Sequence, residues 1–149
     1  METNGIQNKQ VNIEVNHFEI RKTVYEEMIS YCKKALPNEA CGLLSGIQPT
    51  GSTLWKVKNE SLNPNRFYMS VDSIKQAVMK IEENGEKLSG IFHSHPSSHA
   101  FPSSHDIQNN PYTHLAYIIV SFYNGKIEVG CYRMGGETPK KLKLIIIDT

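Results

Sequence analysis

The chain has 149 residues, 39% of them hydrophobic and 21% charged, with a formal net charge of +1. This length is typical of one domain, and the near-neutral charge gives no electrostatic reason to expect a nucleic acid or an acidic membrane as partner. The longest apolar runs, LAYIIV and LIII, are far too short to cross a bilayer, so we expect no membrane-spanning segment.

Residues 1–10 are polar and predict a loose tail rather than a signal segment, followed by a single domain over residues 11–149. The three cysteines are odd in number, widely spaced and without a C-x-x-C pair: Cys32, Cys41 and Cys131. We therefore expect buried, reduced thiols and a cytoplasmic location. Cys41 lies in an apolar segment with nothing nearby to lower its pKa, which favours a core position over a nucleophilic thiol.

The first predicted elements are a strand and a helix. Residues 11–20 alternate as in a strand, beginning with Val11, Ile13 and Val15. Residues 23–36 predict a helix, in which Thr23 and Glu26 have the spacing of a capping box, and Pro37 ends it. The expected apolar face of this helix comprises Val24, Met28, Cys32 and Leu36.

The next segments predict two strands and a second long helix. Residues 40–46, ACGLLSG, are typical of a short buried strand, and residues 53–61 alternate as in another strand. Residues 70–85 predict a helix that stops at Asn84-Gly85. Its expected apolar positions are Val71, Ile74, Val78 and Ile81.

The C-terminal half predicts mainly strands. Residues 87–96 form a strand that ends in a histidine-rich loop, and a short helix follows the loop. Residues 115–122 and 126–134 flank an Asn-Gly turn typical of a hairpin, and residues 141–147 form the last strand. Two long helices, one short helix and six or seven strands predict an α/β (α+β) domain with a mixed or largely antiparallel sheet.

The histidine-rich loop, HSHPSSHAFPSSHD at residues 93–106, holds four of the six histidines. His93 and His95 are two apart at the end of a strand, so their rings lie on the same side, although His-x-His alone is a weak signal. Ser103 and Asp106 would share a face if SSHDIQ opens a helix. For these two residues alone, a helix N-cap is favoured over a binding role.

The combination of residues points more strongly to a metal. Two imidazoles and one carboxylate, from His93, His95 and Asp106, suit Zn²⁺ and leave a fourth position for water, as in catalytic zinc sites. A water bound there has a pKa of about 7, but attack on a carbonyl still needs a base and an oxyanion donor. Ser103 can be the donor. The segment PNEACGLLSG presents a carboxylate, that of Glu39, at the entrance of a strand, although the pattern alone does not select it among the acidic residues.

These residues match a known signature. Glu39 followed by ACGLLSG and, 54 residues on, by HSHPSSHAFPSSHD resembles the JAMM (MPN-plus) metalloprotease motif, Glu…His-x-His-Pro-x₆-Ser-x-x-Asp. The flanking segments GIFHSHP and PYTHLAYIIVSF also look like the bacterial single-domain members, and the resemblance covers about residues 15–135. It implies a curved mixed sheet flanked by two long helices and one short one. It also implies one zinc ion per chain bound by His93, His95 and Asp106, with Glu39 as general acid/base and Ser103 steadying the oxyanion.

The resemblance implies a zinc-dependent peptidase or isopeptidase. A non-catalytic MPN scaffold is the alternative, which is disfavoured because all five motif positions are present. A zinc deaminase is less favoured still, because the H-x-E…P-C-x-x-C pattern is absent.

The resemblance, together with the spacing after the motif, also implies a class of substrate. Only eight residues separate Asp106 from the strand beginning near Leu115, whereas the eukaryotic ubiquitin-cleaving members carry larger insertions there. The smaller bacterial members trim adducts from the Gly-Gly tail of ubiquitin-like sulfur-carrier proteins, so we expect such a protein or peptide as substrate. The sequence leaves open whether the chain forms a homodimer.

For several histidine and aromatic side chains, a surface or core position is favoured over a role in the site. His99 and His105 crowd the same loop, and we expect both at the surface or around the ligands; on a helix, His105 would point about 100° away from Asp106. The aromatic residues that could line a substrate groove, but for which core positions are favoured, are Trp55, Phe67 and Tyr68.

Overall fold

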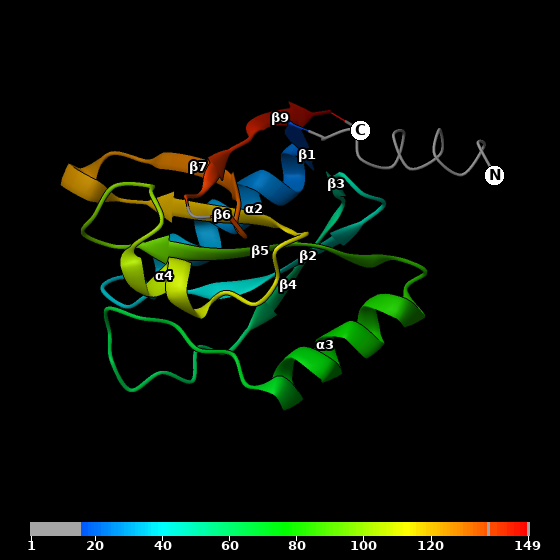
Figure 1. Cartoon of the computed structure of the whole chain (residues 1–149), viewed down its shortest axis with the longest axis horizontal. Helices are drawn as coiled ribbons and strands as arrows, with labels where there is room; N and C mark the ends of the chain where they lie inside the picture. The colour runs from blue at the N-terminus through cyan, green and yellow to red at the C-terminus, as the bar shows by residue number, and fades with distance from the viewer. Residues whose placement is uncertain (1–15, 137, 149) are drawn as a thin grey trace.

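A six-stranded mixed sheet forms the centre of the fold (Figure 1) in the computed structural model, which describes residues 16–136 and 138–148. Its strands, in spatial order, are β4 (Thr53–Val57), β2 (Cys41–Gly46), β5 (Lys87–His95), β6 (Ala116–Ser121), β7 (Glu128–Arg133) and β8 (Lys140–Lys141). β5 and β6 run parallel, and the other neighbours are antiparallel. The predicted mixed sheet in an α+β fold is confirmed.

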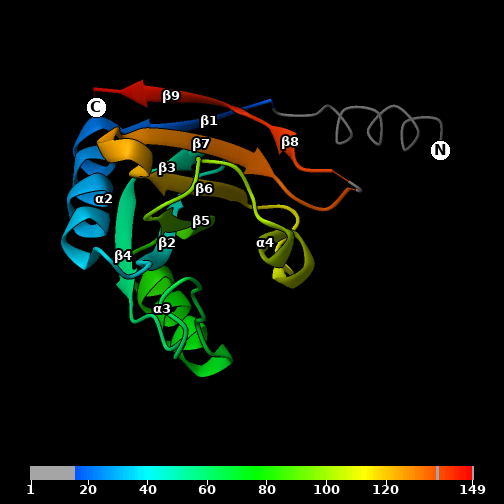
Figure 2. The ribbon, with the colours of Figure 1, turned by 90° about the vertical axis from the view of Figure 1, so that its left-hand side faces the viewer.

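A second, three-stranded sheet joins segments near the two ends of the described chain. Its strands are β3 (Thr50–Gly51), β1 (His17–Arg21) and β9 (Lys143–Ile147), and both pairings are parallel. Figure 2 shows β1 and β9 along the side of the molecule opposite α3 (Val71–Glu83). The first part of the predicted N-terminal strand, residues 11–15, lies outside the described residues.

Helix α2 (Lys22–Ala35) begins directly after β1. The predicted capping box of Thr23 and Glu26 is wrong: Arg21 is the N-cap and makes no side-chain cap hydrogen bond. The chain turns from the strand straight into the helix, which places Thr23 within the first turn instead of ahead of it. Leu36 is also not on the buried face, because it follows the last helical residue and is 38% exposed.

Helix α3 begins and ends close to where the sequence predicts. The Ser70 side chain caps it by accepting a hydrogen bond from the Ser73 backbone N–H at 3.2 Å, and Gly85 follows its end with a φ of +76°. Ile81 is buried as expected, but Val71, in the first turn of the helix, is 66% exposed. None of the helices in the described part of the chain has the length and apolar character needed to cross a bilayer.

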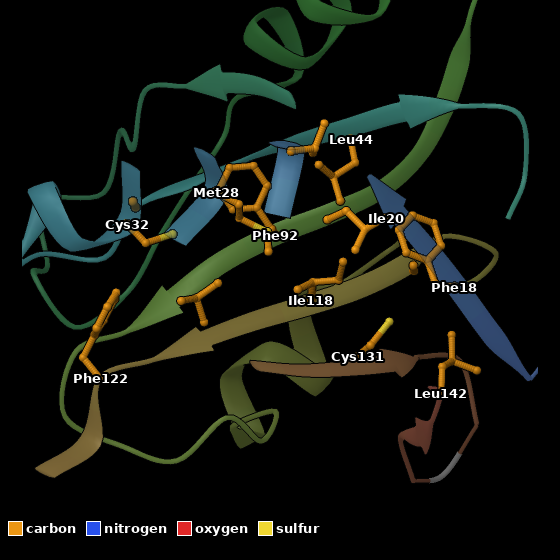
Figure 3. Packing of buried hydrophobic residues seen from close by; sticks show 14 residues of the cluster. Phe18, Ile20, Met28, Cys32, Leu44, Phe92, Ile118, Phe122, Cys131 and Leu142 are labelled. Carbon is orange, nitrogen blue, oxygen red and sulfur yellow. The ribbon is translucent and has the colours of Figure 1, made fainter. Parts of the chain in front are cut away.

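Apolar clusters cover both faces of the central sheet. One cluster packs the sheet against α2 and the three-stranded sheet, and Figure 3 shows its members, among them Phe18, Ile20, Met28, Phe92 and Ile118. The other packs the sheet against α3 and includes Leu43, Ile81, Ile91 and Ile119. Residues 89–95 of β5 and all of β6 are buried, and the β6 sequence, AYIIVS, is nearly continuous in apolar residues, as is typical of a parallel strand covered on both faces. This burial holds the end of β5, which carries the two histidines, in a fixed position.

The predicted hairpin between β6 and β7 is confirmed. The two strands pair antiparallel from Ala116↔Arg133 to Ser121↔Glu128. In the connecting turn, Asn124 and Gly125 have φ values of 56° and 71°. Asn and Gly are the residues that adopt this left-handed conformation most readily, which is why Asn-Gly marks the turn in the sequence.

Candidate metal centre

The end of β5 and the first turn of α4 (Ser104–Asn109) bring three of the predicted residues together. Figure 1 shows α4 beside the arrowhead of β5. The Nε2 atoms of His93 and His95 are 3.1 Å apart. Asp106 Oδ1 lies 3.4 Å from His93 Nε2, and Oδ2 lies 3.2 Å from His95 Nε2. All three side chains are buried, so the group forms a compact set of donors that could hold a metal ion.

The donor separations fit zinc. Zinc in a tetrahedral site binds nitrogen and oxygen at about 2.0–2.2 Å, which places neighbouring donors roughly 3.3–3.5 Å apart. The three separations measured here are 3.1, 3.2 and 3.4 Å. Where no proton bridges them, electron-pair donors that converge this closely away from water repel one another unless a cation lies between them.

Backbone hydrogen bonding orients His95. Its Nδ1 lies 2.9 Å from the carbonyl oxygen of His99, which can only accept a hydrogen bond. In the neutral ring the proton is therefore on Nδ1, and the Nε2 lone pair faces His93 and Asp106. The His99 ring does not take part: it is 67% exposed, with Nδ1 3.4 Å from Glu128 Oε1.

Aromatic packing, rather than hydrogen bonding, orients His93. Phe67 stacks on its ring with centroids 4.4 Å apart, and Tyr117 packs against it at 5.4 Å. Its Nδ1 is buried and has no hydrogen-bond partner among the described residues. The sequence favoured a core position for Phe67 and did not predict its contact with His93. Phe67 lies in a loop whose sequence shows no periodicity, so nothing marked the direction of its side chain.

Ser103 and Asp106 form the N-cap that their spacing predicts. Asp106 N–H donates to Ser103 Oγ at 3.1 Å, and Ser103 N–H donates to Asp106 Oδ2 at 2.9 Å. Burial opposes ionisation of Asp106. In the metal-free site, where His93 and His95 can carry protons on Nε2, hydrogen bonds from both rings outweigh burial and hold the pKa of Asp106 well below its usual range. The Ser103 O–H remains available to donate to another group.

Strand pairing brings Glu39 to the same place. The strands β2 and β5 are antiparallel, with Cys41 opposite His93. The Ser94 side chain, between the two histidines, accepts a hydrogen bond from Ala40 N–H at 2.9 Å. The Glu39 side chain is 8% exposed. Burial raises its pKa to about 8, with His95 opposing this shift and Asp106 adding to it. A carboxyl group in this range can exchange protons near neutral pH.

Two cavities meet beside the candidate metal centre. The first, which we call the polar cleft, has a volume of about 400 Å³, and its lining includes Glu39, Arg66, Ser103, His105 and Asp106. The second, which we call the apolar cavity, has a volume of about 660 Å³, and its lining includes Phe67, Met69, Ile74, Ile91, Tyr112 and Tyr117. Arg66, His105 and Asp106 line both. The predicted base, oxyanion donor and ligand Asp106 therefore face one open space.

The fold and this arrangement of residues define a domain of the JAB/MPN class. The chain belongs to the family described as prokaryotic homologs of the JAB domain, which it matches over residues 21–132. The JAMM/MPN resemblance of the sequence is confirmed at this level.

Two relatives are similar over most of the chain. Over 106 residues the chain is 28% identical to the CysO-cysteine peptidase of Mycobacterium tuberculosis, a match that covers 68% of this chain and 71% of that protein. Protein DSY2949 from Desulfitobacterium hafniense is 28% identical, with a TM-score of 0.80 over 89% of this chain and 94% of that one. A JAB1/MPN domain protein from Archaeoglobus fulgidus shares the fold alone, at 23% identity and a TM-score of 0.56 over 86% of this chain and 99% of that one.

Proposed function

We propose that this protein is a zinc-dependent peptidase that hydrolyses a peptide or isopeptide bond after the Gly-Gly tail of a ubiquitin-like sulfur-carrier protein. The observation that carries the proposal is the convergence of His93, His95 and Asp106 next to a cleft that Glu39 and Ser103 also line. The substrate class draws on the relative named as a CysO-cysteine peptidase.

The two histidines and Asp106 would hold the zinc ion, and the residues of the polar cleft would carry out the proton transfers. When bound, zinc supplies a Lewis acid that polarises the scissile carbonyl and lowers the pKa of water to about 7. Glu39 takes a proton from the attacking water while the water oxygen bonds to the carbonyl carbon. Ser103 O–H donates to the oxyanion that develops. Glu39 then passes the proton to the leaving nitrogen as the C–N bond breaks, which gives a carboxylic acid and an amine.

A reducing compartment is part of the proposal. All three cysteines are free and buried. Burial raises the pKa of each thiol to about 12: Cys32, Cys41 and Cys131. Unpaired cysteines are typical of cytoplasmic proteins, in which thiols stay reduced. This supports action in the cytoplasm, where a sulfur-carrier protein would be met.

The test is cleavage of a sulfur-carrier protein that has been extended beyond its Gly-Gly tail, followed by mass spectrometry. Zinc-loaded protein, protein stripped by a chelator and stripped protein given zinc again are compared. We expect a cut directly after Gly-Gly in the first and third samples only. If the zinc-loaded protein leaves the carrier intact, and stripped and loaded protein bind the carrier equally well, the chain acts as a scaffold and the proposal is wrong.

A further inference from the structure

Arg66 lies where the polar cleft and the apolar cavity meet, since it is one of the residues that line both. Its side chain is exposed, and no carboxylate of the described residues forms an ion pair with it. The other two shared residues are Asp106 and its neighbour His105. Arg66, which has no ion-pair partner among the described residues, therefore lines the space next to the candidate metal centre.

The backbone of Arg66 is held in a fixed relation to Glu39. Residues 58–70, between β4 and α3, have no regular secondary structure. Within them, the Asn59 side-chain amide donates to the carbonyl oxygens of both Glu39, at 2.9 Å, and Arg66, at 3.0 Å. The Asn59 side-chain oxygen also accepts the backbone N–H groups of Ser61 and Tyr68, each at 3.0 Å. The half-buried Asn59 side chain thus connects the proposed base to the segment that carries Arg66, which limits the loop entropy lost on binding.

The chemistry of the cleft selects a carboxylate as the ligand. A guanidinium matches a carboxylate through two parallel N–H···O bonds. The Gly-Gly tail of the proposed substrate has no side-chain carboxylate, so an anion near the scissile bond must come from the residue on the leaving side. If the substrate ends at that residue, its α-carboxylate lies only two bonds from the scissile nitrogen.

We infer that Arg66 binds the free α-carboxylate of a single amino-acid residue that is released from the Gly-Gly tail. This inference rests on the proposed function and narrows it: the chain trims one C-terminal residue from a linear tail instead of cleaving an isopeptide bond to a second folded protein. Phe67 and Tyr117, which adjoin the same space, are neutral and do not compete for the carboxylate.

The test compares two probes that differ in one charge. Both are a β-grasp sulfur-carrier protein ending in Gly-Gly-Ala, one with a free C-terminal carboxylate and one with a C-terminal amide. We expect zinc-loaded wild type to prefer the acid by about 10- to 100-fold in kcat/KM, the range for a lost charge-assisted hydrogen bond. Arg66→Gln should lose this preference, because its kcat/KM should fall about 10- to 100-fold further on the acid than on the amide. Arg66→Lys should keep part of it.

The control is Lys75→Gln, which removes one exposed positive charge from α3 and should leave the preference unchanged. The inference is overturned if wild type cleaves the acid and the amide equally well, or if Arg66→Gln loses the same factor in kcat/KM on both probes. In either case cleavage by wild type still supports the proposed peptidase function. No cleavage of either probe by zinc-loaded wild type instead refutes the proposed function, and the inference with it. Equilibrium binding of both probes to zinc-loaded Glu39→Gln gives a second readout, in which the acid should bind more tightly only when Arg66 is present.

Discussion

Phe67 stacks on His93 with ring centroids 4.4 Å apart and an angle of 25° between the planes. Because His93 Nδ1 has no hydrogen-bond partner among the described residues, this contact is a main restraint on the ring. We expect Phe67→Ala to weaken zinc binding by about 2- to 10-fold, the range for one aromatic pair. Competition with a chromogenic chelator measures the affinity. Leu62→Ala, a truncation of a fully exposed residue in the same loop, is the control, and an equal effect of both variants would contradict the role of Phe67.

Tyr132 forms a hydrogen bond to the loop that contains His99 and Ala100 and that orients His95. Its O–H donates to the carbonyl oxygen of Ala100 at 2.6 Å, next to the His99 carbonyl that accepts from His95 Nδ1. Tyr132→Phe leaves the Ala100 carbonyl without this donor, so the free energy of unfolding should fall by about 1–2 kcal/mol. Urea denaturation of the metal-free protein measures the change. Tyr123→Phe, at a more exposed tyrosine, should have no measurable effect; an equal loss would show that the Ala100 bond does not stabilise the loop.

Ser103 has two roles that substitutions can separate. As the N-cap of α4, it accepts a hydrogen bond from Asp106 N–H. Ser103→Ala should lower the free energy of unfolding by about 1 kcal/mol. Glycine is a better N-cap than alanine, so Ser103→Gly should lower it by only a few tenths of a kcal/mol. Both variants lack the hydroxyl donor, so both should lose about 100- to 1,000-fold in kcat. Thermal unfolding and turnover are measured together. If kcat instead falls only in Ser103→Ala, the less stable variant, Ser103 acts only as a cap.

The pKa of Glu39 predicts an unusual pH dependence of the metal-free protein. Burial raises this pKa from 4.5 to about 8, so between these values the folded state holds a proton that the unfolded state has lost. The contribution of this group to stability therefore falls as pH rises through this window. Glu39→Gln is neutral at every pH, so the metal-free variant should equal wild type near pH 5 and exceed it by roughly 1–4 kcal/mol above pH 8. A difference in unfolding free energy that does not change with pH would contradict the raised pKa.

Local patterns in the sequence were sufficient to predict part of the site. His93 and His95 share a side because of the two-residue period of a strand, and Ser103 and Asp106 pair because of the three-residue spacing of a cap. Both relationships act over a few residues and are confirmed as geometry. The capping box at Thr23 failed because the same spacing occurs inside a helix that begins directly after a strand.

Long-range relationships required the three-dimensional structure or the family resemblance. Glu39 reaches the cleft because β2 pairs antiparallel with β5, a register that brings together residues more than 50 positions apart. The predicted strand over residues 53–61 already ends at Val57. Arg66 and Phe67 lie beyond it, among residues 62–70, whose sequence has no periodicity to mark the direction of their side chains. The two-residue strand β3 was also not predicted, because so few residues carry no alternation signal. The predicted last strand, residues 141–147, is divided in the structure between β8 and β9.

The central claim is that Glu39 acts on a substrate next to a metal held by His93, His95 and Asp106. The most direct measurement determines zinc content and the cleavage rate after Gly-Gly for wild type and Glu39→Gln in parallel. We expect both proteins to bind one zinc per chain, and the variant to be at least about 100-fold slower. Wild-type turnover by Glu39→Gln at full zinc occupancy, or wild type that binds no zinc, would contradict the claim.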